Sequence, residues 1–380
     1  MRERLKVVTI VGTRPEIIRL AATIKRLESD TEHVLVHTGQ NYDYELNEVF
    51  FEDLGLRKPD HFLEADTSSL GAVLGSILQK VERVLLDEKP DAMVVLGDTN
   101  SCISALMAKR LKIPVYHMEA GNRSFDQNVP EETNRRLVDH VSDYNLVYTE
   151  HARRNLLGEG IHPSRILLSG SPMLEVLNQN REAIDASTIL EREGLEKGGY
   201  FLVSIHREEN VDNPERLASV LTSLQRLAAH YDLPVLVSTH PRTKARLAGQ
   251  SAELKNNLVF HAPFGFNDYV NLQINAKLVL SDSGTISEES ASLGFPAVSL
   301  RDAIERPEAI DTGVTITAGV EPEVVLDAVA ITLRQAVEDG PARTPDEYLI
   351  TDVSRRVVNF IRSTAATHHA RNNIRVPAVR

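Results

Sequence analysis

The chain has 380 residues, of which 42% are hydrophobic and 25% charged, a composition that supplies cores for about two domains and excludes disordered or fibrous proteins. Its 42 Lys and Arg against 54 Asp and Glu give a formal charge of -12, which argues against broad binding to nucleic acid or to anionic membranes. With one cysteine, Cys102, and no apolar run long enough for a signal peptide or a membrane span, a cytoplasmic protein is expected.

Short β-branched runs alternate with helix-length stretches in the first half of the chain, and each run is predicted to be a strand. In chain order they are LKVVTIVG (5–12), HVLVHTG (33–39), AMVVLGD (92–98), PVYHMEA (114–120), NLVYTE (145–150) and RILLSGS (165–171). Strands separated by helices are typical of a parallel sheet covered by helices.

The same alternation begins again after residue 171. The predicted strands there are YFLVSIH (200–206), PVLVSTH (234–240), LVFHAP (258–263), KLVLSDSG (277–284), PAVSL (296–300) and GVTITAG (313–319). The simplest interpretation is an α/β fold of two Rossmann-like, doubly wound domains, over residues 1–171 and 172–363. The last helix, TDVSRRVVNFIRS, and a tail over residues 364–380 are expected to pack back on the first domain.

Ligands of open parallel sheets gather outside the carboxyl ends of the strands. In this chain those ends carry glycine and polar residues in both halves, so the cleft between the domains is the expected site. The positions are Gly12 to Arg14, residues 39–41, Gly97, Asp98, Glu119, Ser171, His206, Arg207, His240 and Asp282 to Gly284.

The stretch VGTRPEII (11–18) predicts a turn at Gly12 and Thr13 followed by a helix, with Arg14 beside the helix N-terminus. Free backbone N–H groups and the guanidinium would both face an anion bound there. A capped helix with a solvated arginine explains the same residues, and the dinucleotide motif G-x-G-x-x-G is absent.

The stretch LSDSGTISEES (280–290) places Ser283 and Gly284 between a strand and a helix, with Glu288 and Glu289 about one turn further on. Backbone amides at that start could hold a diphosphate, while a carboxylate could bind ribose hydroxyls. A serine-capped helix with first-turn acids is the alternative.

Candidate acid and base groups follow three of the predicted strands. Asp98 and Glu119 each end an apolar run, so both carboxylates are expected at one cleft, where each raises the proton affinity of the other. Glu131, at a helix start in VPEETNRRLVDH, and His206, in VSIHREENVDN, are further candidates. Alternatively, Glu131 is a surface acid that the helix dipole favours, and His206 is a histidine that only packs.

Several catalytic motifs are absent from the sequence. It contains no Walker lysine loop, H-E-x-x-H, paired C-x-x-C or G-x-S-x-G, so the ATPase, zinc protease and serine hydrolase classes lack support. The scattered acids also lack the spacing of a metal cage, and no metal is expected.

Seven stretches together resemble the non-hydrolysing UDP-N-acetylglucosamine 2-epimerase family, in unbroken motif order from about residue 5 to about residue 320. They are GTRPEII, TGQNYDYELNEVFF, GDTNS, HMEAGNRSFDQNVPEETNR, IHREEN, SDSGTISEES and ERPEA. The resemblance implies two Rossmann-like domains arranged as in two-domain nucleotide-sugar glycosyltransferases, usually in a homodimer. It also implies inversion of carbon 2 by elimination of UDP to a 2-acetamidoglucal and re-addition of UDP, with no nicotinamide or other cofactor.

The resemblance carries the family's acid and base carboxylates onto Asp98, Glu119 and Glu131, and its cleft histidine onto His206. The family's nucleotide contacts fall on Arg14, on Arg19 where many members have lysine, on Phe264 and Tyr269 near the uracil, on Ser283 and Gly284 at the diphosphate, on Glu289 at the ribose, and on Arg306. Thr285 replaces a second glycine of the usual motif, and DAIERPE lacks the usual threonines.

The expected partners are a UDP-sugar substrate and UDP, without nucleic acid or membrane. The family default is interconversion of UDP-GlcNAc and UDP-ManNAc. Two stretches, QNYDYELNEVFFEDLGLRKPDHFLE and GNRSFDQNVPEE, look more like the branch that serves capsule or O-antigen polysaccharide biosynthesis. This resemblance implies a rival substrate, UDP-2-acetamido-2,6-dideoxy-L-talose, whose epimerisation gives UDP-N-acetyl-L-fucosamine. Asn41 and Asp43 differ from the TGQH form and argue against allosteric activation by UDP-GlcNAc. A glycosyltransferase of the same fold, a hydrolysing epimerase and a silent nucleotide-sugar-binding regulator remain alternatives.

Overall fold

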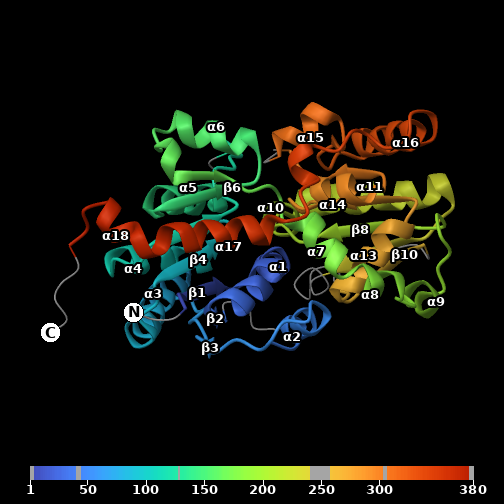
Figure 1. The fold of residues 1–380 in the computed structure, drawn as a ribbon. Coiled ribbons are helices and arrows are strands. Elements are labelled where there is room, and N and C mark those ends of the chain that lie inside the picture. Colours follow the sequence, from blue (N-terminus) through green and yellow to red (C-terminus); the bar gives the residue numbers. More distant parts are fainter. Residues whose placement is uncertain (1–3, 40–43, 127–128, 240–256, 303–305, 376–380) are drawn as a thin grey trace. The chain divides into compact units, whose positions relative to one another are not determined.

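The computed structural model describes residues 4–39, 44–126, 129–239, 257–302 and 306–375. The chain divides into two compact units (Figure 1). Unit 1 consists of Met1–Gln179 and Ile350–Arg380, and unit 2 of Asn180–Leu349. The sequence predicts domains over residues 1–171 and 172–363, with the last helix packing back on the first; unit 1 also takes in residues 172–179 and 350–363.

Unit 1 contains a parallel sheet of seven strands in the order β3-β2-β1-β4-β5-β6-β7. The strands are β1 (Lys6–Val11), β2 (Glu32–His37), β3 (His61–Phe62), β4 (Ala92–Leu96), β5 (Val115–Met118), β6 (Tyr144–Val147) and β7 (Ile166–Leu168). All of these strands except β3 are predicted from the sequence, and β3 is missed because two residues are too few to show a periodic pattern.

Helices connect the strands of unit 1. They are α1 (Arg14–Asp30), α2 (Tyr44–Asp53), α3 (Leu70–Glu88), α4 (Ser104–Arg110), α5 (Pro130–Val141), α6 (Glu150–Gly158), α7 (Met173–Gln179), α17 (Val353–Thr364) and α18 (His368–Arg371), with the 3-10 turns η1 (Asn100–Ile103), η2 (Pro163–Arg165) and η5 (Ala365–Thr367). Helix α3 shows how the sequence sets such limits. Ser69 caps its first turn by accepting the N–H of Ala72, and Lys89 ends it in the left-handed region at φ 48°.

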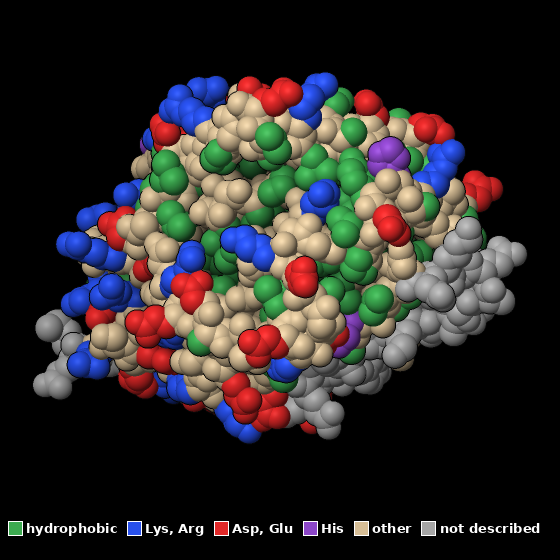
Figure 2. All heavy atoms as spheres, turned by 90° about the vertical axis from the view of Figure 1, so that its right-hand side faces the viewer, with side chains coloured by type: hydrophobic (Ala, Val, Ile, Leu, Met, Phe, Trp, Pro, Cys, Tyr) green, Lys and Arg blue, Asp and Glu red, His purple; other side chains and the backbone are tan. Residues whose placement is uncertain are grey.

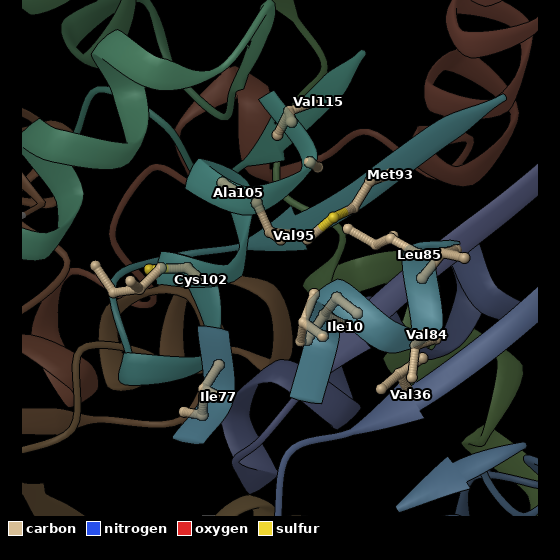
Figure 3. Packing of buried hydrophobic residues seen from close by; sticks show 14 of the residues in the cluster. Ile10, Val36, Ile77, Val84, Leu85, Met93, Val95, Cys102, Ala105 and Val115 are labelled. Carbon is tan, nitrogen blue, oxygen red and sulfur yellow. The ribbon is translucent and has the colours of Figure 1, made fainter. Parts of the chain in front are cut away.

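One face of the unit 1 sheet packs on α3, η1 and α4 through buried apolar side chains (Figure 3). Ile10 and Met93 come from β1 and β4, and Ile77 and Leu85 from α3. Cys102 lies in the same cluster, and its burial, followed by the nearby carboxylates, raises the pKa of its thiol well above the usual value. The core therefore fixes the segments that follow β1 and β4.

Helix α17 packs on α1 within unit 1, which is why residues after Ile350 belong to this unit. It is strongly amphipathic, and Val357 and Ile361 on its apolar stripe are fully buried. Glu175 of α7 accepts hydrogen bonds from the backbone N–H (2.8 Å) and the hydroxyl (2.5 Å) of Ser354 in the first turn of α17. A carboxylate at a helix N-terminus is favoured by the helix dipole.

Unit 2 repeats the architecture with a parallel sheet of six strands in the order β10-β9-β8-β11-β12-β13. Its strands, all predicted, are β8 (Phe201–Ile205), β9 (Val235–Thr239), β10 (Leu258–His261), β11 (Leu278–Ser281), β12 (Ala297–Ser299) and β13 (Ile316–Thr317). Its helices are α8 (Arg181–Asp185), α9 (Ile189–Glu193), α10 (Glu208–Val211), α11 (Pro214–Tyr231), α13 (Phe266–Asn275), α14 (Ile286–Leu293), α15 (Pro307–Thr312) and α16 (Pro322–Glu338), with the 3-10 turn η4 (Asp346–Tyr348).

The two strand orders confirm the predicted α/β class, with two doubly wound parallel sheets. In unit 1 the first three strands run outward from β1 toward one edge of the sheet, and the later strands run outward from β4 toward the other edge. The same change of direction falls between β8 and β11 in unit 2. Such switch points are where open α/β sheets bind ligands, because the loops on either side diverge there.

The surface carries both charges. Figure 2 shows hydrophobic side chains gathered near the middle of one face of the molecule, with acidic and basic side chains around them. No helix within the described ranges is long and apolar enough to cross a membrane.

Candidate active site

The turn between β1 and α1 lies at the switch point of unit 1. Arg14 begins α1 and is half-buried, with its guanidinium carbon 5.5 Å from the centroid of the Phe50 ring in α2. Contact with the aromatic face holds the cation beside the helix N-terminus. The predicted strand, turn and helix are therefore present at the place where an anion was expected.

Two of the predicted carboxylates share one buried arginine. Asp98 follows β4 and Glu119 follows β5, and Arg135 of α5 forms an ion pair with both. Arg135 also donates to the backbone carbonyl of Glu119 (2.6 Å). Glu119 is 4% exposed and has φ 61°, so its backbone adopts a left-handed conformation that costs free energy in a residue other than glycine.

Arg19 of α1 binds the other side of Glu119. It forms an ion pair with the Glu119 carboxylate, and its side chain is buried. The resemblance had placed Arg19 among the nucleotide contacts, whereas its closest partner in the structure is this carboxylate. Two arginines thus balance the charges of Asp98 and Glu119, which compensates for removing these groups from water.

Glu131 lies in the first turn of α5, four residues before Arg135, and is half-buried. Residues four apart lie on the same face of a helix, so this carboxylate projects from the side of α5 that carries Arg135. Its neighbour Glu132 is tied to the preceding loop by the backbone N–H of Ser124 (2.9 Å). Asp98 and Glu119 therefore meet at Arg135, and Glu131 lies on the same face of α5 as that arginine.

A second buried pair lies behind the carboxylates. Asp139 of α5 accepts the backbone N–H of Gly121 (3.2 Å) and faces Nδ1 of His117 (2.9 Å), while Nε2 of His117 faces the carbonyl oxygen of Gly97 (2.7 Å). Burial opposes ionisation of Asp139, but His117 and then Arg123 outweigh it and lower the pKa of this carboxyl. The pair ties together the residues next to Asp98 and Glu119.

In unit 2, Asp282 holds the segment that carries His206. His206 follows β8, and its side chain is 46% exposed. The fully buried carboxylate of Asp282, after β11, accepts the backbone N–H groups of His206 (3.1 Å) and Arg207 (3.0 Å) and lies 3.1 Å from Nδ1 of His206. A proton on Nδ1 would bond to Asp282, leaving Nε2 facing outward as the reactive nitrogen.

The expected uracil and ribose residues lie on α13, α14 and the loop before α13. Gln273 donates to the Glu289 carboxylate (2.6 Å). Burial, followed by the negative charge of Glu289, raises the pKa of Tyr269. Phe264 is buried and stacks on His261, with ring centroids 4.1 Å apart and planes at 7°. These side chains form a pre-organised aromatic and acidic group within unit 2.

A turn lies between β11 and α14, where the sequence predicts one at Ser283 and Gly284. The hydroxyl of Ser283 accepts the backbone N–H of Thr285 (3.3 Å) and lies 2.9 Å from the Thr285 hydroxyl. Gly284 lies between them. Arg306, at the start of α15, is buried and pairs through Nε with Glu288 (3.0 Å), so Glu288 holds a predicted nucleotide contact.

Arg135 and Gln273 were not singled out from the sequence, and Asp282 was named only as the end of a predicted strand. All three hold candidate residues in place. One signal was available for Arg135: it shares a helical face with Val138 and Asp139, so a buried charge was to be expected. His240, Asn41 and Asp43 lie outside the described residues. Within the described ranges, no three His, Cys, Asp or Glu side chains are grouped so as to hold a metal ion.

Two doubly wound sheets, with carboxylates beside one switch point and a helix-start turn beside the other, are typical of α/β enzymes that bind nucleotides. The chain belongs to the UDP-N-acetylglucosamine 2-epimerase family, whose model matches residues 25–362. The prediction of an isomerase of this family is confirmed.

Known proteins resemble the chain over nearly its whole length. It is 40% identical over 346 residues to the UDP-N-acetylglucosamine 2-epimerase of Methanocaldococcus jannaschii, covering 87% of this chain and 93% of the relative. The structure of the Rickettsia bellii UDP-N-acetylglucosamine 2-epimerase matches with a TM-score of 0.89 and 45% identity, covering 97% and 98% of the two chains. The M. jannaschii enzyme in complex with UDP-GlcNAc and UDP matches with a TM-score of 0.89 and 37% identity, covering 95% and 100%.

Proposed function

We propose that the protein is a non-hydrolysing epimerase that interconverts UDP-GlcNAc and UDP-ManNAc. The observation that carries the proposal is the pair of carboxylates, Asp98 and Glu119, held by Arg135 at the switch point of unit 1. The M. jannaschii relative, which was solved with UDP-GlcNAc and UDP, supports this choice of substrate.

The proposed reaction needs acid and base groups but no redox partner. A base takes the proton from carbon 2 while the bond between carbon 1 and the UDP oxygen breaks, giving UDP and 2-acetamidoglucal. The UDP oxygen then bonds again to carbon 1, and carbon 2 receives a proton on the opposite face. Protons and electron pairs balance, so the chemistry requires positioned proton carriers and a site for the leaving diphosphate.

Unit 1 carries the proposed proton-transfer carboxylates Asp98, Glu119 and Glu131. The left-handed backbone of Glu119 and the arginines on both its oxygens fix that carboxylate, as a group that must meet one carbon atom requires. His206 of unit 2 is the proposed histidine of the same reaction, oriented by Asp282.

The remaining predicted residues form the proposed nucleotide site. Each unit offers a proposed contact for the diphosphate: in unit 1 the guanidinium of Arg14, and in unit 2 the helix-start amides of the turn at Ser283 and Gly284. Phe264 and Tyr269 would contact the uracil, Glu289 the ribose, and Arg306 the same nucleotide. Arg19, which pairs with Glu119, would act on the substrate through that carboxylate.

Deuterium incorporation tests the proposal. The purified protein is incubated in heavy water with UDP-GlcNAc and, separately, with UDP-2-acetamido-2,6-dideoxy-L-talose, and NMR follows carbon 2. Exchange with a reversible mixture of UDP-GlcNAc and UDP-ManNAc is expected. Exchange on the 6-deoxy sugar alone would transfer the assignment to that substrate, and the absence of exchange on both, with UDP still bound, would favour a glycosyltransferase or a binding protein.

Substitutions separate the proposed roles. Asp98→Asn, Glu119→Gln, Glu131→Gln and His206→Ala are each expected to lower kcat by about a hundredfold or more while UDP still binds. Arg14→Ala is expected mainly to weaken UDP binding. A variant of the first group with normal turnover would remove that residue from the mechanism.

We also propose a cytoplasmic homodimer. Helices α3, α4 and α5 are neighbours in unit 1, and each carries an exposed leucine: Leu70 (67%), Leu106 (37%) and Leu137 (40%). Exposed apolar groups on adjacent helices are typical of subunit interfaces. Light scattering should give twice the chain mass, and Leu70→Glu with Leu106→Glu should lower it; a monomeric parent protein would overturn this proposal.

A further inference from the structure

Glu16 is a buried carboxyl group that the proposed reaction does not use. It lies in the first turn of α1 and is 1% exposed. Its Oε2 accepts the backbone N–H of Gly12 (2.9 Å) and the hydroxyl of Thr13 (2.9 Å), and its Oε1 accepts the hydroxyl of Ser101. One carboxyl group thus binds both the turn after β1 and the 3-10 turn after β4.

These contacts exceed those of an ordinary helix cap. In a capping box, a glutamate in the first turn reaches back to the cap residue of its own helix, and this part of the arrangement is local. The bond to Ser101 is different, because it spans 85 residues and joins η1 to α1. The side chain is also buried, although a glutamate at a helix start can cap from the surface.

Burial of this carboxyl group is costly at neutral pH. Burial raises the pKa of Glu16 to about 7, against the opposing effect of its hydroxyl and backbone donors. Apolar packing would fill the same volume without this cost, so the contacts to the two turns are what the carboxyl group provides. Residues that break a local rule in this way cluster at functional sites.

We propose that Glu16 is a positioning residue of the epimerase. It fixes the turn that carries Arg14 against the segment that follows Asp98. The two segments belong to neighbouring strands on either side of the switch point, and Glu16 joins them at their carboxyl ends. This inference rests on the proposed function, in which Arg14 binds the diphosphate and Asp98 transfers a proton.

Two substitutions remove different parts of the tie. Ser101→Ala removes the bond from Ser101 to Glu16, together with the 2.8 Å contact between the Ser101 and Thr99 hydroxyls, and leaves the contacts of Glu16 with Gly12 and Thr13 in place. The value of kcat should therefore fall by about tenfold or more while the affinity for UDP is kept. Glu16→Ala also releases the turn of Arg14, so it should lower kcat and weaken UDP binding. Glu16→Gln should restore both to within about threefold, since its carbonyl can accept from Gly12 and its amide can donate to Ser101. Arg26→Ala, on the exposed face of α1, is the control.

Hydrogen exchange provides a readout besides activity. Peptides that cover residues 10–16 and 97–104 should exchange faster in Glu16→Ala than in the parent protein, and Glu16→Gln should restore their protection. Parent-like kinetics and exchange in both Glu16→Ala and Ser101→Ala would overturn the inference, as would faster exchange with unchanged kcat in both. If the parent protein lacks epimerase activity, the proposed function fails, while the exchange data still decide whether Glu16 ties the two segments.

Discussion

The pH dependence of stability should change when Glu16 is replaced by glutamine. The folded protein raises the pKa of this carboxyl from 4.5 to about 7, so the folded state binds the proton more tightly than the unfolded state. The resulting stabilisation is fully present below pH 4.5 and is lost as the pH rises through about 7. At about 1.4 kcal/mol per pKa unit, the difference between 4.5 and 7 corresponds to about 3 kcal/mol.

Glu16→Gln cannot titrate, so the variant lacks this pH dependence and keeps the hydrogen bonds. Between about pH 5 and pH 8.5, the free energy of unfolding of the variant should rise relative to the parent by about 2 to 3 kcal/mol. Asp98 and the Cys102 thiol, which interact electrostatically with each other in the same region, are present in both proteins and largely cancel in this difference.

Urea unfolding at the two pH values measures the effect. Because two units can unfold separately, hydrogen exchange in the β1 and β4 peptides should report the stability of unit 1. If the free energies of parent and variant stay parallel over this range, Glu16 does not titrate there. Burial of this carboxyl group would then carry no such cost at neutral pH.

Three further substitutions, one of them with a matched control, test how the site is held. Arg135→Lys keeps the charge but loses the planar guanidinium that reaches two carboxylates. The free energy of unfolding should fall by about 2 kcal/mol, and kcat by about tenfold or more. An unchanged kcat would refute the shared ion pair. Gly121 has φ 78°, and the Cβ that Gly121→Ala adds would lie 2.4 Å from a backbone carbonyl oxygen of α6, so the free energy of unfolding in urea should fall by about 3 kcal/mol. The control is Gly75→Ala in α3, where the added Cβ meets open space, and it should raise the free energy of unfolding by about 0.5 kcal/mol. Asp282→Asn should lower kcat by about tenfold to a hundredfold with UDP binding kept, and normal turnover would show that the carboxylate does not orient His206.

The sequence predicts this fold well because buried parallel strands are continuous β-branched runs. All strands except β3 follow from that pattern. Helix α17 was expected to pack back on the first domain, and it does pack on α1, although its amphipathic stripe alone shows only that it packs on some surface. The choice depends on tertiary contacts such as the bond from Glu175 to Ser354, which joins residues 179 positions apart.

The candidate carboxylates could be found from the sequence, but the arginines that pair with them could not. Asp98 and Glu119 both end strands at one edge of the sheet, which predicts that each raises the proton affinity of the other. The structure adds Arg135, which pairs with both carboxylates, and Arg19, which pairs with Glu119. Each arginine is on a helix, and only packing determines which carboxylate a helix side chain reaches.

In both units, a side-chain contact joins the two segments on either side of the switch point. Loops diverge between the first and fourth strands of each sheet, so a site there needs a bond across the gap. In unit 1 that bond runs from Ser101, after β4, to Glu16, after β1; in unit 2 it runs from Asp282, after β11, to the backbone and ring of His206, after β8. Each tie joins a candidate acid or base segment to its neighbour. The core already holds the strands, so each bond chiefly fixes the relative position of the two loops that follow them. Removing either bond should therefore lower kcat markedly and the free energy of unfolding only slightly.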